Sequence, residues 1–530
     1  MVAANFCLAQ NNHHVLLIGL NGVSSEAFQY SQTPNIINLL QSGSISLKTR
    51  SVLPTLSAPN WSSHLSGSGP EQTGVTNNNW LPNNFAIEPT VKDNLGHFPS
   101  IFNLIKQNNL QASTAMFYDW DWLGEYLNLN YIDKAVFTAS YTETTEKASE
   151  YIRDKKPVLT FVFYGTPEEI GPLEGHSTIE YYLSIKKIDD EIGKLVSVLK
   201  ETGIYDETNI IIVSDHGGIN KGQSGESMAE IEIPWIITGP GIIKNRVMVE
   251  PNDVINTAPT IAYILGLTQP SYWIGKVVKE AFIKENPDTS GSYPYLPKPQ
   301  CSLKPGVYFN KCELDFSSSV SNLKIRYTLD GTEPNEKSPV YSNHITLKSS
   351  SDIKAVCFDS ISQSQVTNVR VVVVEGVESI SIKDSPSEKY KASGGVTLLD
   401  GERGSKNYRD GKWLGFEGYN MTAVLYFGDD KRRITEVSVG CMQDIKNLIF
   451  FPTEIEFYDS NNGEDFNLVD NIKRTEISGK NLDAKDFSKT FPNLVTRYLK
   501  IIVKNIKVCP VGHPSAGKKA WLFVDEITLH

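Results

Sequence analysis

The chain has few cysteines, and those it has show no recognisable pairing pattern. The six lie at Cys7, Cys301, Cys312, Cys357, Cys441 and Cys509. None has the close pairwise spacing of a zinc knuckle, so that class of metal site is not expected. We predict buried thiols, with a bridge between Cys301 and Cys312 as the alternative in an oxidising compartment.

Long hydrophobic runs and an excess of basic charge are also absent. No window approaches the roughly 20 apolar residues of a membrane span, so none is expected. The formal net charge is -11, and an acidic chain gains no counterion release on binding nucleic acid or an anionic membrane surface. Neither a nucleic-acid polymer nor a membrane is therefore an expected partner.

The first residues, 1–12, lack the basic start of a complete secretory signal. Their apolar and small residues still read like the tail of such a signal, and a plain disordered N-terminus is the equal alternative. The first alternative is consistent with a secreted or periplasmic protein.

Alternating secondary-structure patterns fill residues 13–285. Apolar strand-like runs at 15–20, 157–164 and 210–213 alternate with helical apolar spacing, for example at 181–202. With 530 residues the chain is too long for one core, and roughly two to four domains are expected. This pattern predicts an α/β domain with a doubly wound, mostly parallel sheet.

The second half of the chain reads as all-β. Residues 286–300 are rich in Pro, Ser, Gly and Tyr without periodicity, which indicates a linker. Short alternating strands with turn residues follow, and we divide them into a small β-sandwich at 301–376 and a larger domain at 377–530.

Two segments of the first domain carry candidate chemistry. The apolar run 210–213 leads through Ser214 into Asp215-His216-Gly217-Gly218, which suits two metal ligands at the carboxyl edge of a parallel sheet. The segment 54–61, Pro-Thr-Leu-Ser-Ala-Pro-Asn-Trp, supplies a hydroxyl in Ser57. Together they resemble the alkaline phosphatase superfamily, and most closely its nucleotide pyrophosphatase/phosphodiesterase branch. That resemblance implies a metal-activated Ser57 as nucleophile on a phosphate ester and Asn60 as a donor to a phosphoryl oxygen.

Several positions that the resemblance assigns to the metal site hold other residues. Asn21 stands where the first strand should end in a ligand aspartate, and Glu168 where the next ligand aspartate should fall. Pro172 and Gln223 replace two ligand histidines, while His176, four residues after Pro172, would need a rebuilt loop to coordinate.

These replacements remove negative charge from the predicted site. Two dications would be under-compensated in a buried pocket, which is costly. The sequence therefore predicts at most one zinc ion, held by Asn21, Ser57, Asp215 and His216. Without a metal, the sequence pattern places no base beside Ser57.

Two further resemblances concern the β-rich half. Residues 326–334, with the turn at Asp330-Gly331, resemble the small β-sandwich at the C-terminus of chitobiases and β-hexosaminidases, to which we assign no site. Segments 399–405, 410–416, 459–466 and 519–527 resemble the coagulation-factor type C, or discoidin, jelly roll, whose bacterial versions commonly bind glycans.

The discoidin-like resemblance carries its own site predictions. Asp400, Ser405 and Glu526 occupy places where relatives hold calcium, or they are ordinary turn residues and an exposed glutamate. Trp413 is predicted to stack on a glycan or to lie in the core, and His513 to face a sugar or to brace its loop.

Two function classes follow. The first is a hydrolase of phosphate esters, directed to glycans by the last domain, with weakened or altered metal dependence. The second is a non-catalytic glycan-binding protein that keeps the hydrolase domain as a scaffold. Sulfate-ester hydrolysis is less favoured, because no Cys/Ser-x-Pro-x-Arg run surrounds Ser57. A histidine near Gln223 in space would favour the enzyme, and a site filled by Pro172 would favour the scaffold.

Overall fold

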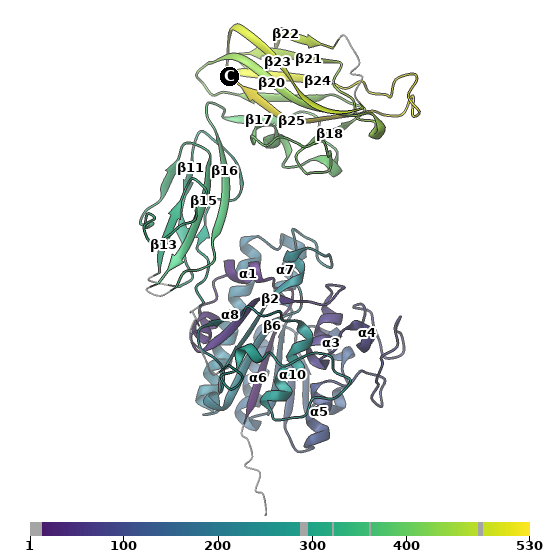
Figure 1. The fold of residues 1–530 in the computed structure, drawn as a ribbon, viewed down its shortest axis with the longest axis vertical. Helices are drawn as coiled ribbons and strands as arrows, with labels where there is room; N and C mark the ends of the chain where they lie inside the picture. Colours follow the sequence, from purple (N-terminus) through teal and green to yellow (C-terminus); the bar gives the residue numbers. More distant parts are fainter. Residues whose placement is uncertain (1–12, 287–294, 321–322, 360–361, 475–480) are drawn as a thin grey trace, which may run out of the picture. The chain divides into compact units, whose positions relative to one another are not determined.

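The computed structural model describes residues 13–286, 295–320, 323–359, 362–474 and 481–530. The predictions for residues 1–12, for Cys7 and for most of the linker lie outside these ranges. Contacts between residues separate the chain into two compact units, the first containing 1–300 and the second most of 301–530. Each unit is shown in Figure 1.

The first unit is built on one eight-stranded sheet. Its order is β4-β3-β5-β1-β6-β7-β2-β8. The strands are β1 (His14–Leu20), β2 (Gly43–Arg50), β3 (Thr114–Tyr118), β4 (Lys134–Phe137), β5 (Leu159–Tyr164), β6 (Thr208–Ser214), β7 (Glu232–Thr238) and β8 (Arg246–Val247). Only β7 runs antiparallel to its two neighbours, β6 and β2, so the predicted mostly parallel sheet is confirmed.

Helices cover both faces of this sheet (Figure 1). They are α1 (Ser25–Tyr30), α2 (Pro34–Leu40), α3 (Ser57–Ser66), α4 (Pro70–Thr73), α5 (Ile101–Asn108), α6 (Tyr141–Lys155), α7 (Thr166–Glu174), α8 (Ile179–Glu201), α9 (Met228–Ile231) and α10 (Thr257–Ile264). Short 3-10 helices lie at Asp121–Tyr126, Leu129–Tyr131, Tyr205–Glu207, Val254–Asn256 and Lys279–Ala281.

Alternate residues of the central strands enter two separate cores. Leu17 of β1 packs with α3, α5 and α10, whereas Leu16 and Ile18 pack with α2, α6 and α8. Such alternation follows from the two-residue period of a strand that is buried on both faces. Tyr295, within the predicted linker 286–300, also packs against Phe28 of the second core.

The second unit contains only strands and short 3-10 helices among its described residues. The first strands are β9 (Gln300–Cys301), β10 (Gly306–Phe309), β11 (Cys312–Leu314), β12 (Phe316–Ser317), β13 (Lys324–Thr328), β14 (Ile345–Leu347), β15 (Ser351–Phe358) and β16 (Thr367–Val374). By the same division, Gln300 of β9, the first two residues of β13 and the last three of β15 belong to the first unit. A four-stranded sheet has the order β10-β16-β15-β13.

The C-terminal strands form two facing sheets. They are β17 (Ser379–Ile382), β18 (Leu414–Glu417), β19 (Met421–Tyr426), β20 (Arg432–Asp444), β21 (Glu454–Ser460), β22 (Asn467–Lys473), β23 (Leu482–Thr496), β24 (Tyr498–Lys504) and β25 (Trp521–Leu529), with 3-10 helices at Glu388–Tyr390, Gly394–Leu399 and Ile445–Asn447. The orders are β17-β19-β24-β21-β22 and β18-β25-β20-β23, around one apolar core. The all-β prediction is confirmed, while the discoidin-like assignment stays a prediction.

The cysteines of the described residues are free thiols. Cys301 is half-buried, and Cys312, Cys357, Cys441 and Cys509 are buried. The structure therefore contains no Cys301–Cys312 bridge, in line with the predicted thiols. Within the described part of the chain, no helix combines the length and apolar character that a bilayer crossing requires.

Candidate functional site

The candidate site lies where three neighbouring parallel strands end. β5, β1 and β6 are adjacent and parallel, so their carboxyl ends meet at one edge of the sheet. Asn21 follows β1, Asp215 and His216 follow β6, and Glu168 lies in α7, the helix after β5. The topology thus gathers residues that are far apart in the sequence.

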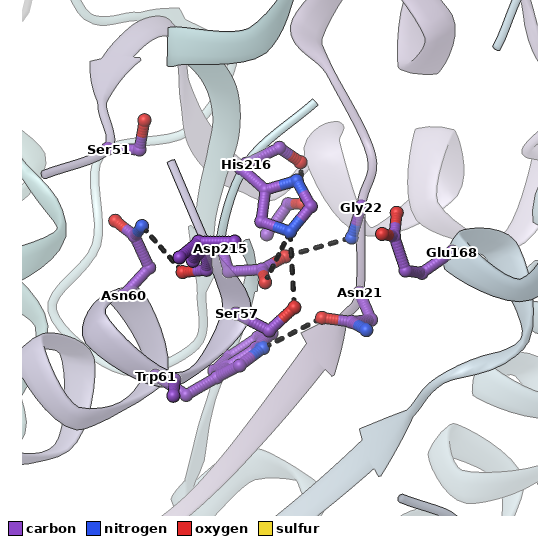
Figure 2. A network of polar contacts seen from close by, with 12 residues as sticks. Asn21, Gly22, Ser51, Ser57, Asn60, Trp61, Glu168, Asp215 and His216 are labelled. Carbon is purple, nitrogen blue, oxygen red and sulfur yellow. Dashed lines mark hydrogen bonds and ion pairs between the residues drawn. The ribbon is translucent and has the colours of Figure 1, made fainter. Parts of the chain in front are cut away.

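Ser57 is the first residue of α3 and points at His216 (Figure 2). Its Oγ lies 3.2 Å from His216 Nε2. The His216 Nδ1 atom is 2.8 Å from the carbonyl oxygen of Gly217, to which it donates, so Nε2 is free to accept. The structure therefore places a base beside Ser57 that the sequence pattern did not predict.

Asp215 contacts the same ring nitrogen of His216 as Ser57 does. Its Oδ1 accepts the Gly22 N–H at 2.8 Å, and its Oδ2 is 3.2 Å from His216 Nε2. Burial disfavours the charged imidazole, but the carboxylates of Asp215 and Glu168 outweigh this effect and raise the pKa of His216. Apart from that ion pair, Asp215 Oδ2 has no hydrogen-bond partner in the described residues.

The two predicted amide contributors are engaged elsewhere. Asn21 Oδ1 accepts the indole N–H of Trp61 at 3.0 Å. Asn60 accepts the Val52 N–H at 2.7 Å, and its amide donates to backbone carbonyls, most closely that of Leu56 at 2.9 Å. Asn60 therefore holds the 52–56 loop, and its predicted contact with a phosphoryl oxygen would require these bonds to break.

The positions after β5 are arranged differently from the sequence expectation. Pro172 is exposed within α7 and does not fill the site. His176 is buried, and its Nε2 lies 3.8 Å from Glu168 Oε2. His176, which follows α7, therefore lies next to Glu168. Gln223 is half-buried, and its Oε1 has no hydrogen-bond partner among the described residues.

The donors fit one cation better than two. Tetrahedral zinc ligands at about 2.1 Å from the ion lie roughly 3.4 Å from one another. Ser57 Oγ and Asp215 Oδ2 each lie 3.2 Å from His216 Nε2, which is close to that spacing. No group of three or more His, Cys, Asp or Glu suited to a metal ion occurs in the described ranges. A cation here would depend on the serine oxygen and on water.

Sequence reasoning missed His64, which anchors α3, the helix that begins at Ser57. Trp235 donates to Thr257 Oγ1, the Thr257 hydroxyl lies 2.8 Å from His64 Nδ1, and His64 Nε2 lies 2.9 Å from the carbonyl oxygen of Ser214. The hydrogen-bond chain ties α3 to the end of β6. The available signal was spacing: residue 64 lies two helical turns after Ser57 and so on the same face.

The predicted glycan residues of the second unit have structural roles. Trp413 is 2% exposed, donates to the Ser405 carbonyl oxygen and packs against Phe523, so it is a core residue that offers no stacking face. His513 Nε2 lies 3.0 Å from the Ile445 carbonyl oxygen, and its Nδ1 accepts the Ser515 N–H. His513 therefore braces its loop.

The predicted calcium residues use their oxygens within the protein. Asp400 accepts the Glu402 N–H, Ser405 Oγ accepts the Asn407 N–H, and Glu526 accepts the Gly401 N–H. Burial, with the Asp400 charge, raises the pKa of Glu526 to about 8. Nothing in the described residues supports a bound calcium ion, which stays a prediction.

Family profiles match two segments of the chain. The type I phosphodiesterase / nucleotide pyrophosphatase profile matches residues 15–224, and the chitobiase/β-hexosaminidase C-terminal domain profile matches residues 303–368. A mouse bis(5'-adenosyl)-triphosphatase is 24% identical over 212 residues, 38% of this chain and 46% of its own. A rat ectonucleotide pyrophosphatase/phosphodiesterase family member 3 is 25% identical over 215 residues, 38% of this chain and 24% of its own.

The chain thus spans less than half the length of these relatives. A Drosophila extracellular sulfatase homologue is 27% identical over 117 residues, 21% of this chain and 10% of its own. Among solved structures, human ectonucleotide pyrophosphatase/phosphodiesterase 5 has a TM-score of 0.43 at 15% identity, covering 49% of this chain and 98% of its own. A protein in complex with its substrate D-glucosamine-2-N,6-O-disulfate has a TM-score of 0.42 at 14% identity, covering 60% and 88%. Residues 15–224 are therefore similar to the type I phosphodiesterase / nucleotide pyrophosphatase family, and residues 303–368 to the chitobiase/β-hexosaminidase C-terminal domain.

Proposed function

We propose that the first unit hydrolyses phosphate esters with Ser57 as the nucleophile. The observation that carries this proposal is a pair of contacts to one ring nitrogen. Ser57 Oγ and Asp215 Oδ2 each lie 3.2 Å from His216 Nε2. Ser57 also opens a buried ten-residue helix, whose N-terminus favours a negatively charged group.

The chemistry is a displacement at phosphorus. Ser57 Oγ forms a bond to the phosphorus atom, the bond to one ester oxygen breaks, and that oxygen leaves as an alcohol after gaining a proton. Water then cleaves the phosphoserine and restores the hydroxyl. His216 Nε2 is placed to accept the serine proton, and Asp215 stabilises the imidazolium that forms. A zinc ion held by Ser57, Asp215 and His216 would instead lower the pKa of the serine hydroxyl.

Sulfate esters remain the less favoured substrate. Ser57-Ala58-Pro59-Asn60 is followed by Trp61. Trp61 is fully buried and donates to Asn21, so it does not supply the positive charge of the arginine in the sulfatase run.

We extend the proposal to the setting of the protein. The match of residues 303–368 to a chitobiase/β-hexosaminidase C-terminal domain supports an association with glycan-bearing material outside the cytoplasm. A glycan site on the second unit, if present, uses residues other than Trp413 and His513, whose polar atoms are already bonded.

The second candidate is a non-catalytic scaffold, and one observation favours it. Ser57 is 4% exposed, and Asp215 and His216 are both 0% exposed. A phosphate ester therefore reaches Ser57 only if the covering segments move.

The test is turnover of bis(p-nitrophenyl) phosphate by the full chain after equilibration with zinc. Hydrolysis that is lost in Ser57→Ala and kept in Ser62→Ala supports the enzyme. Ser62 is the matched control because it lies in the same helix and is also 4% exposed. Equal turnover by both variants, or none by the parent chain, selects the scaffold.

A further inference from the structure

A cavity of about 230 Å³ lies in the first unit and is lined only by residues of that unit. Its walls come from the start of α1, from β2, from the segment 228–232 and from residue 298. One water molecule takes up about 30 Å³, so the cavity has room for a solute much larger than a single water.

The cavity borders the segment that carries His216. Ser24 lines the cavity and packs so closely against Gly217, the residue after His216, that a Cβ atom on Gly217 would lie 2.5 Å from Ser24 Cβ. Neither Ser57 nor His216 is among the lining residues. The cavity is therefore a neighbour of the Ser57 site and not a part of it.

Ser25 gives this cavity an unused hydroxyl group. Ser25 is 3% exposed, and its Oγ has no hydrogen-bond partner among the described residues. The cap of α1 does not need this hydroxyl, because Ser24 Oγ already accepts the Ala27 N–H at 3.0 Å. Buried hydroxyl groups are nearly always hydrogen-bonded, so an unpaired one that lines a cavity indicates a solute that bonds to it.

Lys298 brings a positive charge to the same cavity. Its side chain is half-buried, and burial lowers the pKa of its ammonium group. The ammonium lies 5.9 Å from the centre of the Tyr30 ring, and it has no hydrogen bond or ion pair within the part of the chain that the structure describes. A charged group that loses water without gaining a counter-charge is unfavourable, so an anion would stabilise Lys298.

The charges around the cavity favour an anionic solute. Lys48 and Lys298 line the cavity together with Glu26 and Glu232. Glu232 already pairs with Arg50 at 3.2 Å, and the charge of Glu26 offsets only part of the effect of burial on Lys298. Three positive groups thus accompany two carboxylates, and neither lysine has an ion-pair partner among the described residues.

We propose that this cavity binds a sulfate or phosphate group, separate from the ester that reacts at Ser57. A tetrahedral oxyanion offers at least three acceptor oxygens, which matches the three donors Ser25 Oγ, Lys48 Nζ and Lys298 Nζ. Because the cavity has room for more than one such group, the oxyanion can be a free ion or can be carried by a sugar. No bond is formed or broken in this binding, so it does not depend on hydrolysis at Ser57.

The experiment is a calorimetric titration of the full chain with sodium sulfate and, separately, with glucose 6-sulfate. Lys298→Gln should weaken sulfate binding about 10-fold, because a charge-assisted hydrogen bond is lost. Ser25→Ala should weaken it about 3-fold to 10-fold and should not lower the unfolding temperature, because the hydroxyl has no partner in the folded chain. Lys187→Gln, an exposed position on α8, is the control and should bind sulfate as the parent chain does.

The two probes separate the sources of the oxyanion. Tighter binding of glucose 6-sulfate than of sulfate identifies a sugar-borne group as the ligand, and equal affinities identify the free ion. Equal sulfate affinity in Lys298→Gln and the parent chain overturns the inference, as does a parent chain that binds no sulfate at low ionic strength.

The Ser57 site provides the remaining check. Sulfate binding that is lost in Ser57→Ala and kept in Ser25→Ala also overturns the inference, because the anion would then lie at Ser57. If Lys298→Gln does not fold, Ser25→Ala alone decides. Sulfate binding that depends on Ser25, in a chain without phosphodiester turnover, refutes the proposed function and leaves this inference standing.

Discussion

The polar atoms of Asp215, Glu168 and His176 at the sheet edge of the first unit differ from those of Trp413 and His513 in the second unit in how their hydrogen bonds are satisfied. In the second unit, His513 uses both ring nitrogens and Trp413 uses its indole N–H within the protein. At the sheet edge, oxygens of Asp215 and Glu168 and one nitrogen of His176 are buried without hydrogen-bond partners in the described residues. Satisfied groups brace a fold, whereas unsatisfied buried groups cost stability and are retained where a ligand pairs with them.

The largest expected effect follows from removing Ser57, the proposed nucleophile. Ser57→Ala should lower the rate of phosphodiester hydrolysis by about 10³-fold or more, because the variant lacks the serine oxygen that attacks phosphorus. The unfolding temperature should change little, since only one buried hydroxyl contact is lost. Steady-state rates and thermal unfolding of the same sample measure both. If Ser57→Ala hydrolyses the phosphodiester at the parent rate, the sheet edge of the first unit does not carry the hydrolysis.

The second prediction tests the structural side of the comparison. Trp413→Ala should lower the free energy of unfolding of the second unit by about 3–5 kcal/mol, because it leaves a cavity in the core. Hydrogen exchange across β20 and β25 of the full chain measures this loss. Tyr419→Ala, at a position 36% exposed, is the control and should cost far less. A Trp413→Ala chain of unchanged stability that no longer binds glycans would favour glycan stacking, one of the two alternatives that the sequence left open for Trp413.

The sequence predicted the fold and the position of the site best where an apolar strand pattern leads directly into a motif. Apolar alternation predicted the parallel sheet, and the Asp215-His216 pair after β6 predicted the edge at which Ser57 also lies. Contacts within the site could not be predicted, because they depend on rotamers and loop paths. Asn60 was expected to face a substrate but bonds to its own loop. His176 was expected to need a rebuilt loop to coordinate a metal, which stays a prediction; in the structure its Nε2 lies 3.8 Å from Glu168 Oε2.

The third prediction concerns a buried histidine whose nitrogens are both bonded. Burial lowers the pKa of His64 to about 4, from 6.5. Between these values the unfolded chain binds a proton that the folded chain does not, so stability falls as pH is lowered from 6.5 to 4. The loss over the whole window is on the order of 3 kcal/mol.

Urea unfolding of the full chain at pH 7, 6, 5 and 4 measures this slope. His64→Gln should be less stable at pH 7, because the contacts to Thr257 and Ser214 are disturbed. Its stability should also depend less on pH in that window. Parallel profiles for the parent and variant chains would mean that burial does not lower the pKa of His64 in the folded chain.

The smallest effect is expected from adding charge at the edge. Asn21→Asp places a second carboxylate one residue from Gly22, whose N–H contacts Asp215. Zinc affinity should rise about 10-fold, since carboxylate ligands bind zinc more strongly than amides do. The metal-free variant should unfold at a lower temperature, because a buried carboxylate without a cation is costly.

Asn60→Asp provides the matched control for this change. Asn60 is also a buried asparagine near Ser57, but its amide donates to the Leu56 carbonyl oxygen, a bond that a carboxylate cannot make. This control should lose stability and gain no zinc affinity. Equal zinc affinity in Asn21→Asp and the parent chain would place the cation away from β1. The positive group that pairs with the oxygens of Asp215 and Glu168 would then lie out of contact with residue 21.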